Sequence, residues 1–333
     1  MSNFVAINAK IDAMYAKLLN DKDYDNLSSM ASVSSAIEYL EKTELLKGFS
    51  LGTSISEAEE ALNFFSFREL DRLTNYLTGV YRSFLLEYLR EEEIDSLKKA
   101  LRFLVRDRNL SSYDLSISGK NFDIAGLDVK TFVEKLKGTI YYNTLKTYVD
   151  ESDELILFYM EMNLDKLYFN RIYETVKSFD KENSEEFSKI FGRKIDVTNL
   201  RWIYRGSVNY RLLPEELLNF VIFGGKYLSF ESLKDMCYLD NKRAYKEIVK
   251  NTPYEILFDE NGEIVDNMSI KANRQVNDFA LREFNKSHTN LGHLLSFLII
   301  FEAQIKDIKI FMEALRLGMS KSKIYEYLVN VRK

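Results

Sequence analysis

Proline and cysteine are both scarce in this chain of 333 residues. The two prolines are Pro214 and Pro253, and there are only 13 glycines. Both residue types interrupt helices, so their scarcity permits long uninterrupted helices. The single cysteine, Cys237, excludes a disulfide within the chain and fits a reducing compartment. We expect this cysteine to behave as a small, semi-buried apolar residue.

Long hydrophobic runs are also missing. The longest apolar stretch covers only residues 294–301, whereas a membrane-spanning helix needs about 20 apolar residues. The first five residues lack the basic segment and the apolar run of a signal peptide. We therefore expect a chain that does not cross a bilayer, so that any association with a membrane is peripheral.

An excess of positive charge is absent as well. Lysine and arginine number 46, aspartate and glutamate number 51, and the net charge is −5. A nucleic-acid binder needs a basic surface to neutralise phosphates, so this balance disfavours that class of protein. Hydrophobic residues make up 46% of the chain and charged residues 29%, which predicts a folded rather than a disordered chain.

Motifs for nucleotide or metal chemistry fail their spacing tests. Residues 118–121 and 224–227 resemble phosphate loops, but neither has the spacing of a P-loop, so we expect helix-terminating glycine turns. The acidic segment 21–25 lacks the glycine and the final glutamate of a calcium loop. His288 and His293 are five residues apart, whereas zinc-binding pairs on a helix lie four apart. We expect no catalytic residue, no metal and no cofactor.

Helical periodicity dominates the chain. Apolar residues recur at spacings of three and four, which is the pattern of an amphipathic helix. The pattern predicts helices over residues 4–19, 67–94, 154–179, 291–317 and 320–331.

The segment 256–265 is an exception. It contains an Asn-Gly pair flanked by apolar residues, which is consistent with either a hairpin or an exposed irregular loop.

A first short pattern occurs three times, and we place it at the end of a helix. A glutamate is followed five residues later by Thr43, Thr139 or Thr252, and the residue two positions after the glutamate is apolar in each copy. The threonines are 96 and 113 residues apart. Repeats at a regular spacing indicate a repeated structural module.

A second pattern alternates with the first along the chain. It consists of a polar residue, an apolar or small residue and a base, and we place it at the start of a helix. The copies are residues 8–10, 96–98, 199–201 and 307–309. Together the two patterns predict one three-lobed domain over residues 1–333, with repeats 1–94, 95–197 and 198–304. Residues 305–333 are predicted to pack back on the N-terminal helices.

The bases of the second pattern are the candidate functional residues: Lys10, Lys98, Arg201 and Lys309. One interpretation makes them related polar contacts that face a partner along the axis of the three lobes. The other makes them intramolecular, since each base can pair with a nearby acid or cover helix carbonyls, and surface ion pairs are common and weak.

Several blocks resemble the C-subunit family of V-type (A/V-type) ATPases and ATP synthases, whose equivalent in the eukaryotic pump is called the d subunit. The central blocks cover residues 195–203, 213–217 and 223–229. Residues 136–142 match another block, with Ile140 where proline is more usual, and residues 7–19 and 302–320 fit the ends of the family pattern. The opening helix carries fewer arginines than is usual for the family.

This resemblance implies an all-α fold of three similar helical bundles in a pseudo-threefold arrangement around a central funnel. It implies a non-catalytic rotor component on the cytoplasmic face of the membrane, which links the central stalk (D- and F-type subunits) to the membrane rotor ring. This component would transmit torque for proton or sodium transport coupled to ATP. ATP chemistry and ion passage would belong to other subunits.

The alternative is a helical scaffold that recruits cytosolic partners. Helical-repeat scaffolds usually have repeats of about 33–47 residues, and the longer spacing in this chain disfavours them. An all-helical enzyme would need a convergent acid or metal cluster, for which the sequence offers no motif with the required spacing.

Overall fold

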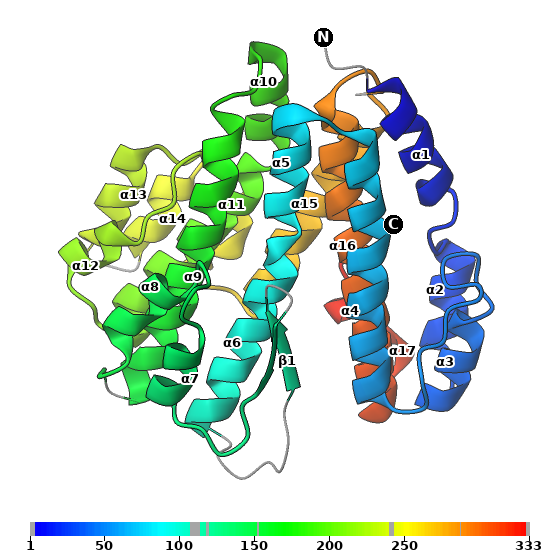
Figure 1. The fold of residues 1–333 in the computed structure, drawn as a ribbon. Helices are drawn as coiled ribbons and strands as arrows, with labels where there is room; N and C mark the ends of the chain where they lie inside the picture. The colour runs from blue at the N-terminus through cyan, green and yellow to red at the C-terminus, as the bar shows by residue number, and fades with distance from the viewer. Residues whose placement is uncertain are drawn as a thin grey trace. The chain divides into compact units, whose positions relative to one another are not determined.

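The computed structural model describes residues 4–106, 114–117, 120–151, 153–239, 243–286 and 288–330, and the described elements are almost all helices (Figure 1). The all-α fold class is therefore confirmed for this part of the chain. The chain divides into two compact units. Unit 1 consists of Met1–Thr78, Asp180–Lys194 and Asp240–Lys333, and unit 2 consists of Gly79–Phe179 and Ile195–Leu239.

Unit 1 is built around its longest helix, α16 (Leu291–Arg316). Every residue from Leu291 to Phe301 is buried, so the longest apolar run of the sequence lies in the core of this unit. The elements that contact α16 are α1 (Val5–Tyr15), α2 (Asp21–Ser28), α3 (Val33–Leu40), α4 (Ile55–Asp71), α10 (Lys181–Ile190), α15 (Met268–Phe284) and α17 (Lys321–Tyr327). The remaining elements are η1 (Arg72–Tyr76), α14 (Arg243–Val249) and η4 (Glu255–Leu257).

Two buried polar side chains on α16 bind the backbone of neighbouring segments. The Gln304 side chain accepts a hydrogen bond from the Leu19 amide (2.8 Å) and donates one to the Leu19 carbonyl (3.1 Å). The Asp307 carboxylate accepts bonds from the amides of Val329 (2.6 Å) and Asn330 (2.8 Å) and from the Tyr24 hydroxyl (2.9 Å). Burial raises the pKa of Asp307, and the two amides oppose this rise. These contacts join segments almost 300 residues apart in sequence to one helix.

Unit 2 is organised around α9 (Asp153–Val176), which contacts α5 (Gly79–Tyr88), α6 (Arg90–Arg106), α8 (Tyr142–Leu145) and η2 (Lys146–Tyr148). One apolar cluster of this unit contains Phe158, Tyr159, Met162 and Trp202. The other elements are α7 (Val129–Lys135), α11 (Gly192–Tyr204, in this unit from Ile195 onward), the π-helix η3 (Arg205–Asn209), α12 (Pro214–Asn219) and α13 (Phe230–Cys237).

A two-stranded antiparallel hairpin packs on α6. Its strands are β1 (Asp114–Ile117) and β2 (Lys120–Asp123), in a register that pairs Leu115 with Phe122. This hairpin was not predicted from the sequence, because strands of four residues are too short to show a clear period-two alternation. Residues 118 and 119, half of one glycine motif considered as a phosphate loop, lie outside the described residues.

Most of the predicted helices are confirmed. The segments 4–19, 154–179 and 291–317 correspond to α1, α9 and α16, and 320–331 corresponds to the shorter α17. The single helix predicted over 67–94 is wrong. The chain leaves the helix after η1, Leu77 is extended, Gly79 has a φ of +54°, and a second interruption at Leu89 separates α5 from α6. Glycine takes a left-handed conformation at little cost, so Gly79 marks a break where the helical pattern alone indicated continuity.

The Asn-Gly segment forms a tight turn with a single antiparallel bridge, between Phe258 and Ile264. Gly262 has a φ of +75°, and the Asp259 amide donates to the Glu263 carbonyl at 2.8 Å. The structure is therefore intermediate between the two predicted alternatives: the turn forms, but no pair of strands follows from it.

The three repeated threonines have the same local geometry. Thr43, Thr139 and Thr252 each follow a helix, and each hydroxyl donates to the carbonyl three residues earlier, at 2.6, 2.7 and 2.6 Å respectively. The residue that accepts each bond is Leu40, Leu136 or Val249, and each is fully buried. The predicted position at a helix end is confirmed for all three copies. The second pattern was placed at helix starts, and this is wrong for 96–98, 199–201 and 307–309, which lie inside α6, α11 and α16.

Candidate functional site

Helix α9 is held against α5 and α6 by four polar pairs, which we call the α9 ladder. The pairs are Glu87–Arg171, Glu91–Tyr168, Lys98–Asp165 and Arg102–Glu161. Residue numbers rise along α5 and α6 as they fall along α9, so the ladder connects antiparallel helices.

The first two pairs place acids on α5 and α6. Arg171 donates two bonds to Glu87, both of 2.7 Å, and the Tyr168 hydroxyl donates to Glu91 at 3.2 Å. Burial raises the pKa of Glu87, but Arg171 and Arg90 together lower it below its usual value. A bidentate contact of this kind has both strength and a defined orientation.

The other two pairs reverse the charges. Lys98 and Arg102 lie one turn apart on α6, and they bind Asp165 and Glu161, which lie one turn apart on α9. Lys98, Asp165 and Glu161 are each less than a tenth exposed. Because acids and bases exchange helices along the ladder, moving α9 by one pair in the direction that brings Asp165 to Glu91 would place two acids opposite each other.

Arg201 lies at the edge of this ladder. Its guanidinium is 3.8 Å from Asp165 and stacks near the Trp202 ring, with 5.3 Å from Cζ to the ring centroid. Arg205 stacks near the same ring at 5.0 Å. The Trp202 indole donates to Asp165 at 2.8 Å. About a third of the Arg201 side chain is exposed, so its charge is available at the surface of unit 2.

A glycine-containing loop is attached to α11 through one carboxylate. Asp196, fully buried, accepts bonds from the amides of Lys226 (3.0 Å), Tyr227 (2.8 Å) and Leu228 (3.3 Å). A Cβ atom on Gly225 would lie 2.1 Å from the Asp196 carboxylate. The glycine is therefore required for close approach, and the sequence motif is a structural loop rather than a phosphate loop.

Exposed aromatic rings lie in this loop and at the start of α13, which follows it. Phe223 and Phe230 are stacked with centroids 5.6 Å apart, and they are 54% and 41% exposed. On the inner side of the loop, the Asn199 side chain exchanges two bonds with the Ile222 backbone, at 2.8 and 2.9 Å.

The four predicted bases therefore have different surroundings. In unit 2, Lys98 is buried against Asp165 and Arg201 is partly exposed. In unit 1, Lys309 donates to Asn63, and Lys10 is half-buried on α1. Lys98 and Arg201 thus each have a nearby acid, as the second interpretation expects, whereas Lys309 binds a side-chain amide oxygen. A role of the four bases in binding a partner remains a prediction.

Two histidines and an aspartate meet in unit 1, which the sequence spacing did not indicate. The buried His293 ring is 3.0 Å from the Asp12 carboxylate through Nε2, and its Nδ1 is 2.9 Å from the Phe284 carbonyl. The His288 ring lies beside the His293 ring, tilted by 42°, with centroids 4.6 Å apart. Burial lowers the pKa of His293, although Phe284 and Asp12 oppose this effect. His288 precedes α16, so the helical spacing of zinc-binding pairs does not apply to it.

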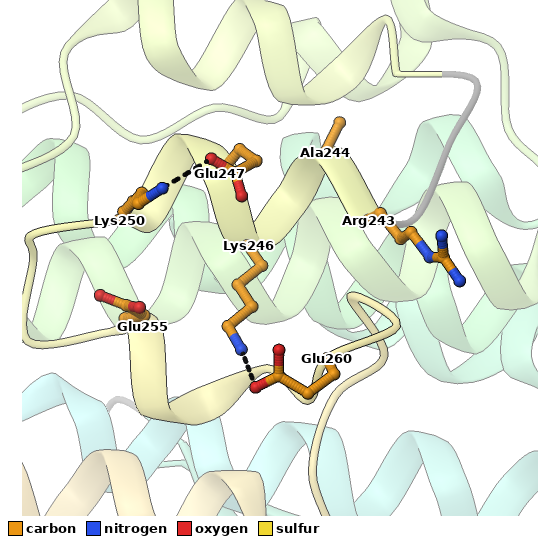
Figure 2. Close-up of a pocket in the computed structure, with 7 residues that line it drawn as sticks. All are labelled: Arg243, Ala244, Lys246, Glu247, Lys250, Glu255 and Glu260. Carbon is orange, nitrogen blue, oxygen red and sulfur yellow. Dashed lines mark hydrogen bonds and ion pairs between the residues drawn. The ribbon is translucent and has the colours of Figure 1, made fainter.

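A surface depression of about 550 Å³ lies beside α14 (Figure 2). The lining residues are Arg243, Ala244, Lys246, Glu247, Lys250, Glu255 and Glu260. Lys246 pairs with Glu260, which raises the pKa of Lys246, and Lys250 pairs with Glu247 at 3.3 Å. Small-molecule sites are mostly apolar with a few polar groups, and this depression has the opposite composition.

In the described part of the chain, no helix combines the length and the apolar character needed to cross a membrane.

Comparison with known proteins identifies the family. The sequence profile of the ATP synthase (C/AC39) subunit family matches residues 7–327. The chain is 27% identical to the C subunit of the A-type ATP synthase of Methanococcoides burtonii, over 71% of this chain and 68% of that protein. It is 23% identical to the corresponding C subunit of Methanocaldococcus jannaschii, over 99% of this chain and 87% of that protein. The match extends from the first helix to the last, and the chain belongs to the ATP synthase (C/AC39) subunit family.

Proposed function

We propose that this protein is the non-catalytic subunit that links the central stalk of a V-type or A-type rotary ATPase to its membrane rotor ring. The observation that carries the proposal is the family match over residues 7–327, because it includes the elements of both units. The protein would bind peripherally at the cytoplasmic face and transmit torque for proton or sodium transport. Its partners would be the D- and F-type stalk subunits and the ring.

The proposal includes three similar helical bundles around a central funnel. The three threonine turns support it, since the same hydroxyl-to-carbonyl bond ends α3, α7 and α14. A contact shared by two copies of the second pattern, residues 199–201 and 307–309, supports the repeat in the segment 305–333 as well. Asn199 binds the backbone 23 residues later, and Asp307 binds the backbone 22 and 23 residues later.

Torque transmission requires helices that do not slide along one another. The α9 ladder meets this requirement in unit 2, because its reversed charges fix one register of α9 against α5 and α6. Close packing of the apolar clusters adds stiffness, since protein interiors are as dense as organic crystals.

Of the four bases, Arg201 and Lys10 are the best stalk-contact candidates. Lys98 and Lys309 bind Asp165 and Asn63 at hydrogen-bond distance, whereas Arg201 lies 3.8 Å from Asp165 and keeps about a third of its side chain exposed. A partly exposed arginine can fix the register of a protein interface through its charge. We expect Arg201→Glu to weaken binding of the purified D- and F-type stalk pair roughly tenfold or more. The new glutamate would face the acidic groups that Arg201 is proposed to contact, and like charges across an interface repel each other. The exposed Arg211 of the same unit provides the matched control, Arg211→Glu.

The decisive experiment is affinity purification of the tagged chain from gently solubilised native membranes, followed by mass spectrometry. Stoichiometric recovery of the catalytic head, the stalk and the ring supports the linking role. Recovery of unrelated soluble proteins alone would overturn it and would favour a scaffold that recruits cytosolic partners.

A further inference from the structure

The contact between His293 and Asp12 has an unusual balance of donors and acceptors. The Phe284 carbonyl can only accept, so His293 Nδ1 must be the donor in their 2.9 Å bond. In the neutral ring, Nε2 then has no proton and presents a lone pair. That lone pair faces a carboxylate oxygen of Asp12 at 3.0 Å. The lone pair and the carboxylate oxygen repel each other at this distance unless a proton or a metal cation lies between them.

We propose that Asp12, His288 and His293 form a binding site for one divalent transition-metal ion, with zinc as its best-suited occupant. Imidazole nitrogens and a carboxylate are ligands that zinc prefers. One ligand atom from each of the three residues lies within 4.8 Å of the other two. Metal–ligand distances of about 2.0–2.1 Å place tetrahedral ligands roughly 3.3 Å apart. Asp12 and His288 are both exposed. Their side chains therefore have room for the small movement that would bring the ligand atoms from within 4.8 Å of one another to tetrahedral spacing.

The surroundings of His293 match those of a metal ligand. Histidines that bind metals usually donate their second ring nitrogen to a carbonyl or carboxylate, which fixes the ring and its tautomer. The Phe284 carbonyl does this for His293. The ring is also stacked on Phe284, with centroids 4.0 Å apart, so Nε2 is held in one direction toward Asp12.

The Asn8 side chain is a fourth polar group beside the cluster of Asp12, His288 and His293. Asn8 lies one turn before Asp12 on α1, and its amide nitrogen donates to the His288 carbonyl at 2.6 Å. The Asn8 side chain is only 4% exposed, and its Oδ1 has no hydrogen-bond partner in the described part of the chain. Because a buried polar oxygen needs a partner, Asn8 Oδ1 gives independent support for a cation in this cluster, which it could contact directly or through a bound water. The bound ion would join α1 to the turn between α15 and α16.

The site is tested with the untagged full-length chain, stripped with a chelator and dialysed against zinc alone. We expect uptake of one ion per chain, measured by inductively coupled plasma mass spectrometry. Asp12→Asn and His288→Ala each replace an exposed ligand, so both variants should fold, which circular dichroism verifies. Each should weaken zinc binding by more than the roughly 10–100-fold that loss of a mere hydrogen-bond partner of a ligand costs. Asp266→Asn, at another exposed aspartate of unit 1, should bind like the wild type.

The zinc-loaded wild-type chain gives a second measurement that does not depend on any variant. Its X-ray absorption spectrum should show two imidazoles and oxygen ligands around the metal. Absence of uptake by the wild type, equal uptake by all four chains, or a spectrum without imidazole would each overturn the proposal.

Discussion

The central helices of the two units bury polar groups in different ways. In unit 1, α16 is apolar along most of its length, and its buried Gln304 and Asp307 bind mainly backbone groups. In unit 2, α9 buries Glu161 and Asp165 against the charged side chains of α6. Backbone contacts join distant chain segments to α16, whereas paired charges define the register of α9. Around α9, unit 2 therefore depends on matched charges in addition to apolar burial. In unit 1, the buried Glu283 that pairs with Lys189 lies on α15 rather than on the central helix α16.

The largest effect is expected from breaking the ladder with Asp165→Ala. This change leaves Lys98 and the Trp202 indole without their common acceptor, and removal of one member of a buried ion pair costs about 3–5 kcal/mol. Urea unfolding monitored by circular dichroism measures the loss. Glu174→Ala is the matched control on α9, because Glu174 pairs with Lys177 at the exposed surface and should change little. Equal losses in the two variants would contradict the ladder.

A cavity in unit 1 should produce the second-largest effect. Leu298 on α16 is fully buried, and replacing a buried leucine with alanine typically costs about 2–5 kcal/mol. Amide hydrogen exchange should show lower protection along α16 and its neighbours. Salt provides a further test of this comparison. Added sodium chloride should leave the loss of unfolding free energy caused by Leu298→Ala unchanged. A strongly salt-dependent loss would mean that charge, rather than apolar burial, stabilises α16.

The threonine turns should respond alike in both units. Thr43 and Thr252 lie in unit 1 and Thr139 in unit 2, and each donates one partly buried bond to a carbonyl. Replacing each with valine should lower the free energy of unfolding by about 0.5–1.5 kcal/mol, the usual contribution of one hydrogen bond. Thr131→Val, at an exposed position of α7, provides the control. Markedly unequal losses would break the equivalence of the three turns.

The smallest effect concerns pH and the single cysteine in unit 2. Burial raises the pKa of Cys237 from 9.0 to about 12. The folded thiol is harder to ionise than the unfolded one. The contribution of this thiol to the free energy of unfolding is therefore fully present below pH 9 and is lost as the pH rises toward 12. At pH 8, thiol labelling should be on the order of a thousandfold slower in the folded chain than in urea, in line with a shift of about three pH units. Rapid labelling of folded protein would contradict the burial of this side chain.

Periodicity predicted the parts of the fold that depend on local pattern. The apolar spacing identified α9 and α16, and the repeated threonines marked three helix ends. The same spacing continued across Leu77 and Gly79, where one positive φ angle breaks the helix. Such a break depends on the left-handed backbone conformation of Gly79, around which a Cβ would meet no atom within 4 Å, and the periodicity of apolar residues does not encode a backbone angle.

The candidate sites depended on contacts between distant residues. Lys98 was identified as a notable base, but its partner Asp165 is 67 residues away and has no sequence signal. His288 and His293 were judged by a helical spacing, whereas Asp12 reaches His293 from 281 residues away. Only the fold brings these groups together, so no pattern within a short window could have predicted either cluster.

The position of α16 in the chain has a consequence for synthesis on the ribosome. Helices α1–α4 emerge first, but the helix that covers their apolar faces begins only at Leu291. The apolar side chains that α16 covers on these helices therefore stay exposed while more than 200 further residues are synthesised. Unit 1 therefore cannot complete its core until α16 has left the exit tunnel. Chaperones that hold exposed apolar segments would act on the N-terminal helices during this interval.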